Sequence, residues 1–137
     1  MEKIRVNVII PTYRPGKEFV ELLKGIKKQE YQPDKVIIMN TEEEYWDVHW
    51  ETLCPKTEVH HIKKNEFDHG GTRKAGAALA DGSILVFMTQ DAVPYDKYLI
   101  GNLIKPLLEK EDVGAAYARQ LPKEDCSFLE KCTRSFN

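Results

Sequence analysis

Residues 84–94, with the sequence ILVFMTQDAVP, join a strongly apolar run to three polar residues. Residues 84–88 are the most apolar segment of the chain, and five consecutive apolar residues are typical of a strand buried on both faces. Thr89, Gln90 and Asp91 follow at once, before a proline ends the segment. The pattern therefore places a carboxylate where a buried strand ends.

The segments around this strand alternate between strand and helix patterns. Four more strands are predicted, at residues 4–10, 36–39, 57–62 and 113–118. Three helices are predicted, at 18–29, at 71–80, which is Ala-rich and suited to close packing on a sheet, and at 98–108, with an interruption near Pro106. A short helix is expected at 124–136. Apolar strands alternating with helices indicate an α/β fold with a mostly parallel sheet and helices on both faces.

The composition is that of a single globular domain and argues against a nucleic-acid-binding or membrane-spanning protein. The 137 residues suit a single domain, and 42% are hydrophobic and 31% charged, as in ordinary globular proteins. With 20 Lys+Arg against 22 Asp+Glu, the net charge of -2 gives no basic field for nucleic acid. No apolar run reaches the roughly 18 residues that a membrane helix needs, and no signal sequence is recognisable. Three cysteines without a Cys-x-x-Cys pair fit a reducing compartment, so a cytoplasmic location is expected.

Ligands of open α/β sheets bind outside the carboxyl ends of the strands, where the strand order reverses. The polar and turn residues expected there are Pro11, Thr12 and Tyr13 after the first strand, Asn40 and Thr41 after the second, and Thr89, Gln90 and Asp91 after the fourth. Asp91 has two possible roles. Its carboxylate could hold a magnesium ion together with a diphosphate, or it could cap the helix that follows.

Two other segments each allow two interpretations. Gly70 and Gly71, followed by Thr72 and Arg73, could bind phosphate at a helix N-terminus, or they could form a loop in which Thr72 caps and Arg73 is solvated. The acidic run 42–44, with aromatic residues behind it, could belong to a sugar-binding surface. A solvated first helical turn is the favoured interpretation of that run.

Three stretches together resemble the family 2 glycosyltransferases, and within them the rhamnosyltransferase-like branch. They are VIIPTYRPGKEF, FDHGGTRKAGAALADGSILVFMTQDAVP and VGAAYARQLPKED, and they extend over nearly the whole chain. The resemblance implies a GT-A fold, a nucleotide-diphosphate sugar donor, a bound Mg²⁺ or Mn²⁺ ion and inversion at the anomeric carbon. It also implies that residues 1–137 form the N-terminal, donor-binding part, with the acceptor half and the general base beyond Asn137.

The resemblance assigns roles to particular residues. It places Pro11, Thr12, Tyr13, Asn40, Arg73, Gln90 and Asp91 at the nucleotide sugar, with Asp91 as the metal ligand. Asn40 stands where the family commonly has Asp, Thr89 where many members have the first Asp of an Asp-x-Asp motif, and Lys74 where Asn is usual.

The implied donor is dTDP-rhamnose and the implied acceptor a glycan or a lipid-linked glycan at the inner face of the membrane. Self-association is expected if apolar surface is left uncovered. Two alternatives remain. The first is a catalytically inactive module that binds a nucleotide sugar. The second is a nucleotidyltransferase, for which the segment Pro11–Gly16 offers only one Arg and one Gly as a phosphate loop.

Overall fold

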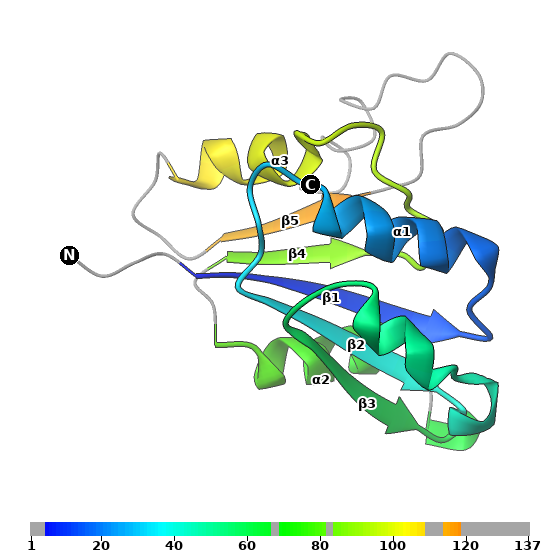
Figure 1. The fold of residues 1–137 in the computed structure, drawn as a ribbon. Helices are drawn as coiled ribbons and strands as arrows, with labels where there is room; N and C mark the ends of the chain where they lie inside the picture. The colour runs from blue at the N-terminus through cyan, green and yellow to red at the C-terminus, as the bar shows by residue number, and fades with distance from the viewer. Residues whose placement is uncertain (1–4, 67–68, 82–83, 109–113, 119–137) are drawn as a thin grey trace, which may run out of the picture.

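The structure is a computed structural model that describes residues 5–66, 69–81, 84–108 and 114–118. Its five strands are all parallel and lie in the order β3-β2-β1-β4-β5 (Figure 1). The strands are β1 Val6–Tyr13, β2 Lys35–Thr41, β3 Thr57–Ile62, β4 Ile84–Met88 and β5 Gly114–Ala118. The helices are α1 Lys17–Lys27, α2 His69–Leu79 and α3 Leu99–Leu108, and short 3-10 helices lie at Glu43–Tyr45, Val48–Thr52 and Lys64–Glu66. The predicted α/β fold class is confirmed.

The order of the strands reverses at β1. The chain moves outward from β1 to β2 and β3, and then returns to the other side of β1 for β4 and β5. In sheets of this kind the crevice between the two central strands, here β1 and β4, is the usual place for a ligand. The polar residues predicted from the sequence lie at that edge.

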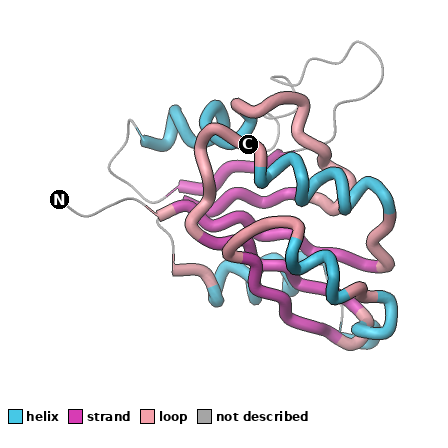
Figure 2. Tube along the Cα trace, viewed as in Figure 1, coloured by secondary structure: helices cyan, strands magenta, loops and turns pink. Residues whose placement is uncertain are grey.

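Helices cover both faces of the sheet (Figures 1 and 2). On one face α1 and α3 bury a row of side chains that includes Val8, Ile38 and Val86. On the other face α2 packs on a smaller cluster that includes Ile9 and Met39. Alternate strand residues point to opposite faces, so the continuous apolar runs of β1 and β2 supply both cores.

Helix α2 lies unusually close to the sheet at Gly76. A Cβ atom added there would be 2.7 Å from Ile9 Cγ2 and 3.3 Å from Met39 Cγ. The absence of a side chain at this position therefore lets the helix backbone approach β1 and β2. The Ala-rich composition of 71–80 predicted this kind of packing.

Several predicted boundaries were wrong. β1 continues to Tyr13 and β2 to Thr41, so Pro11 and Asn40 lie in strands rather than after them. Pro11 is tolerated because the β1–β4 ladder ends at the pair Ile9–Phe87, and beyond it β1 pairs with β2 alone. Helix α3 runs two residues past Pro106 without the predicted interruption. The helix expected at 124–136 lies outside the described residues.

Candidate functional site

The carboxyl ends of β1 to β4 meet at one edge of the sheet and form the candidate site. Across the point of strand reversal, the backbone N–H of Tyr13 donates to Gln90 Oε1 over 2.7 Å. This bond ties the end of β1 to the turn after β4. No partner of the Gln90 Nε2 group is recorded among the described residues, so the amide remains available to a ligand beside Asp91.

A row of polar side chains, buried at Thr12 and Asn40 and exposed at His61, forms the floor of this edge. Thr12, Asn40 and His61 are paired in register on β1, β2 and β3, two positions beyond the apolar pair Ile10 and Ile38 and on the same face of the sheet. Thr12 Oγ1 donates to Asn40 Oδ1 over 2.8 Å, and Asn40 Nδ2 lies 3.1 Å from His61 Nδ1. Because Asn40 Nδ2 is a donor, a neutral His61 carries its proton on Nε2, which lies 3.9 Å from Glu43 Oε2.

The hydrogen bonds of this row occupy the side chain of Asn40, which the sequence had placed at the nucleotide sugar. Its side chain is fully buried, and both ends of the amide are bonded to protein groups. Thr12 is 2% exposed and is also bonded within the row. Both residues therefore shape the floor of the crevice, and the more exposed Pro11 and Tyr13 form its accessible surface on β1.

Asp91 lies in the turn that follows β4. Its Oδ1 atom accepts a hydrogen bond from Thr89 Oγ1 over 3.0 Å, and the residue is partly exposed. Helix α3 begins only at Leu99, and its first backbone N–H groups are bonded elsewhere. Tyr98 N donates to Asp96 Oδ1, and Ile100 N donates to Gln29 Oε1. The alternative in which Asp91 caps the following helix is therefore wrong.

The chemistry of this edge fits a magnesium-type ion held by one protein carboxylate. Among the residues that the structure describes, no group of three or more His, Cys, Asp or Glu side chains could hold a metal alone. Mg²⁺ often takes one or two carboxylates and completes its shell with phosphate oxygens and water. Asp91, with one oxygen held by Thr89, suits that role.

The first turn of α2 lies at the same edge of the sheet, because α2 starts shortly after the carboxyl end of β3 (Figure 1). The helix begins at His69, so Gly70 and Gly71 belong to it rather than to a loop, and both are exposed. Thr72 is buried within the helix and cannot be its cap. Arg73 follows and is half-buried. Helix N-termini attract phosphate through their backbone amides and the helix dipole.

A cavity of about 350 Å³ opens beside the polar row, between the ends of β2 and β3. It is lined by residues 42–44 and 61–64. Glu42, in its wall, has a positive φ of 66°, which is strained for a residue with a side chain. The buried atoms Glu42 Oε1 and, on neighbouring Thr41, Oγ1 have no hydrogen-bond partner. Among the described residues, the Glu42 oxygen thus lacks a hydrogen-bond donor, and the Thr41 hydroxyl, which can donate or accept, lacks any partner.

The aromatic residues after Glu44 divide into two groups. Trp46 and Trp50 pack edge-to-face with each other, with ring centroids 5.0 Å apart, and the centroid of each lies 5.6 Å from that of Phe19. Both are partly buried and pack against the core beneath α1. Tyr45 remains 38% exposed and contacts Arg14.

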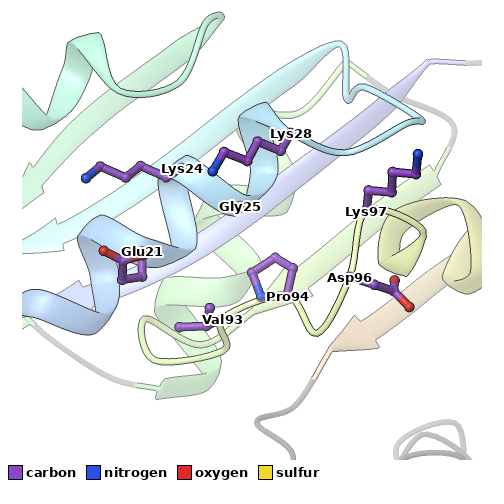
Figure 3. Close-up of a pocket in the computed structure, with 8 residues that line it drawn as sticks. All are labelled: Glu21, Lys24, Gly25, Lys28, Val93, Pro94, Asp96 and Lys97. Carbon is purple, nitrogen blue, oxygen red and sulfur yellow. The ribbon is translucent and has the colours of Figure 1, made fainter.

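A second cavity, of about 290 Å³, lies between α1 and the segment after β4 (Figure 3). Lys24, Lys28 and Lys97 line it, and Pro94 forms its floor. The Pro94 ring packs so closely on Gly25 that an added Cβ atom would be 2.7 Å from Pro94 Cδ. This contact fixes the segment just after Asp91 against α1.

Comparison with known proteins identifies the family. The sequence matches glycosyl transferase family 2 over residues 7–136. The chain belongs to this family. It is 33% identical over 135 residues to the O-antigen chain rhamnosyltransferase RfbN of Salmonella typhimurium, covering 98% of this chain and 43% of that protein. It is also 33% identical to the O-antigen chain rhamnosyltransferase WbaN of Salmonella anatum, covering 96% of this chain and 42% of the relative.

The solved structures agree on the fold. A crystal structure of S. aureus TarS, residues 1–349, superposes with a TM-score of 0.61 at 23% identity, covering 77% of this chain and 33% of that one. This likeness shows the GT-A fold. This family 2 chain spans less than half the length of the two rhamnosyltransferases that it matches. None of the helices in its described part is long and apolar enough to cross a membrane.

Sequence reasoning missed several residues at this family 2 site. The contacts of His61 with Asn40, and of Arg14 and Lys64 with Tyr13, depend on the register of β1 to β3 and on the turn after β1. The match between Asn40 and His61 could have been found only from a correct alignment of the two strands. No sequence signal indicated the position of Lys64.

Proposed function

We propose that this chain is the donor-binding part of a glycosyltransferase that transfers a sugar from a nucleotide-diphosphate sugar to a glycan or lipid-linked acceptor. The proposed transfer is metal-assisted and inverts the anomeric carbon, and the proposed donor is dTDP-rhamnose. The observation that carries this proposal is the position of Asp91, a carboxylate at the reversal point of the sheet that does not cap α3. The rhamnosyltransferase names of the two relatives support the choice of sugar.

The residues of the crevice have distinct proposed roles. Pro11 and Tyr13 lie along the nucleoside, while Thr12 and Asn40 hold the floor on which it rests. Gln90 ties Tyr13 to the turn that carries Asp91, so the nucleoside and diphosphate sides of the crevice keep a fixed relation.

The diphosphate is proposed to lie between Asp91 and the start of α2. Asp91 would hold Mg²⁺ or Mn²⁺, which supplies positive charge to a diphosphate leaving group. The start of α2 at Gly70 and the side chain of Arg73 are proposed to contact the phosphate oxygens, since helix N-termini and guanidinium groups bind phosphate.

Acceptor recognition is proposed to involve residues outside this sequence, since the relatives are more than twice as long. We also propose that the protein acts in the cytoplasm, at the inner face of the membrane. Asp112, Glu124 and Asp125 lie outside the described residues, and none is assigned as the general base.

A thermal-shift panel of nucleotide sugars with Mn²⁺ tests the proposal. The panel contains dTDP-rhamnose, other dTDP- and UDP-sugars, and GDP- and CMP-sugars as controls. Binding to the folded state raises the melting temperature according to the ligand concentration relative to Kd. We expect the largest shift with dTDP-rhamnose, and equal or absent shifts across the panel would contradict the proposal.

A further inference from the structure

Four side chains form a cationic and aromatic rim at the carboxyl edge, next to the crevice. We define the Arg14 rim as Tyr13, Arg14, Tyr45 and Lys64. The guanidinium carbon of Arg14 lies 4.4 Å from the Tyr45 ring centroid and 5.2 Å from the Tyr13 ring centroid. Arg14 Nη2 also donates to Tyr45 Oη over 3.0 Å. Tyr13 thereby connects the rim to the bond that it makes with Gln90.

The backbone holds Arg14 in a strained conformation. Its φ of 47° lies in the left-handed region, which costs a residue with a Cβ roughly 1–2 kcal/mol. Pro15 follows and further restricts the residue before it. Strain of this kind persists where the surrounding structure holds it in place, and it clusters at ligand sites. The turn sets the backbone of Arg14, and the contacts with Tyr45 hold its guanidinium group.

The two cations of the rim lie close to one aromatic ring, and three carboxylates, those of residues 42–44, line the same cavity as Lys64. Lys64 Nζ lies 5.7 Å from the Tyr13 ring centroid, so the ring is near two cations. Within the described ranges, neither Arg14 nor Lys64 has a carboxylate within ion-pair distance. Two like charges around one ring repel each other unless an anion lies between or beside them.

The location of the rim indicates which anion it could bind. Lys64 also lines the 350 Å³ cavity, and Tyr13 is bonded to the residue that precedes Asp91. The rim therefore lies on the β1 and β3 side of the crevice, where the segment of Lys64 directly precedes α2, whereas Asp91 lies on the β4 side. A diphosphate between Asp91 and the start of α2 would lie beside the rim. A guanidinium group uses several N–H donors and can bind phosphate oxygens in a bidentate manner.

We propose that Arg14, held by Tyr13 and Tyr45 and assisted by Lys64, binds the diphosphate of the donor nucleotide. This inference rests on the proposed function, because it assumes that a nucleotide occupies the crevice. It assigns a binding role to a residue that neither the strand ends nor the family motifs had indicated. It also predicts that the chain distinguishes a diphosphate from the free nucleoside chiefly by charge.

Calorimetry on the 137-residue chain with Mn²⁺ tests this assignment, using dTDP, thymidine and inorganic pyrophosphate as separate ligands. The test variant is Arg14→Gln, and Lys28→Gln is the matched control because Lys28 lies at the far end of α1, away from the crevice (Figures 1 and 3). We expect Arg14→Gln to weaken dTDP and pyrophosphate binding by about tenfold or more and to leave thymidine binding within about twofold. Lys28→Gln should bind all three ligands like the unmodified chain. Circular dichroism verifies that both variants are folded.

The other outcomes separate this inference from the proposed function. Equal weakening of thymidine and dTDP would show that Arg14 supports the base, and would overturn the assignment. Unchanged dTDP and pyrophosphate affinity in Arg14→Gln would also overturn it. If the unmodified chain bound pyrophosphate as well as dTDP and Arg14→Gln abolished both, the anion rim would be upheld while the nucleotide-sugar function failed. Binding of neither ligand by the unmodified chain would reject both.

Discussion

Replacing Gly76 with Ala tests whether the close approach of α2 to the sheet is required. The new Cβ would lie 2.7 Å from Ile9 Cγ2, and Ile9 is fully buried with a branched, rigid side chain. Overpacking of this kind costs about 1–3 kcal/mol, whereas Gly→Ala inside a helix returns up to about 1 kcal/mol. Gly70→Ala is the control, because nothing lies within 4 Å of a Cβ added there.

Urea unfolding followed by circular dichroism measures the comparison. We expect Gly76→Ala to be less stable than Gly70→Ala by about 1–3 kcal/mol, with an unchanged denaturant slope. If the added Cβ atom pushed α2 away from the sheet, Arg73 on the same helix would also shift relative to the crevice. Equal stability of the two variants would show that α2 does not need this close contact. It would refute the reasoning that Gly76 is required for α2 to approach β1 and β2.

Three further results are expected. Thr12→Val leaves buried Asn40 Oδ1 without its donor and should lower the unfolding free energy by about 1–3 kcal/mol, whereas a loss below about 0.5 kcal/mol would argue against the polar row. Burial raises the pKa of the Cys54 thiol, so mass spectrometry should find it alkylated slowly at pH 7.5 in the native chain and rapidly in urea; rapid native labelling would contradict its 2% exposure. Desolvation alone would raise the pKa of Asp81, but the hydrogen bond with Asn7 and the charges of Arg5 and Lys35 lower it below its ordinary value. The stabilisation by the charged form is therefore present above the ordinary pKa of Asp, about 4, and is lost as the pH falls through the lowered pKa, so Asp81→Asn should be less stable than the unmodified chain at pH 7, with a difference that shrinks as the medium is acidified; a constant difference would exclude this linkage.

The sheet was predictable from sequence because its strands are short, apolar and separated by clear turns. The chain order of strands and helices, and the residues at the carboxyl edge, followed from this pattern and from the rule for open α/β sheets. The ends of β1 and β2 were placed too early because Pro11 and Asn40 are normally turn residues. Their strands continue because β1 has lost its β4 partner by Pro11, and because Asn40 is satisfied by Thr12 and His61.

The role of Asp91 could be stated but not decided from the sequence. A carboxylate after a buried strand suits both a metal site and a helix cap. The structure excludes the helix cap, because Asp96 and Gln29 accept hydrogen bonds from the amides of Tyr98 and Ile100 at the start of α3. The metal role of Asp91 stays a prediction. The contacts of Arg14 were equally hidden, because they join the turn after β1 to residues after β2 and β3.

The affinity of the chain for dTDP with and without Mn²⁺, measured for the unmodified chain and for Asp91→Asn, tests the central claim most directly. Asp96→Asn is the control, since it removes an exposed carboxylate from the same segment and keeps the Oδ1 acceptor for Tyr98 N. The account predicts that Mn²⁺ tightens binding by about tenfold or more in the unmodified chain and in Asp96→Asn, and has no effect in Asp91→Asn. Metal-independent binding by the unmodified chain, or full Mn²⁺ dependence in Asp91→Asn, would contradict it.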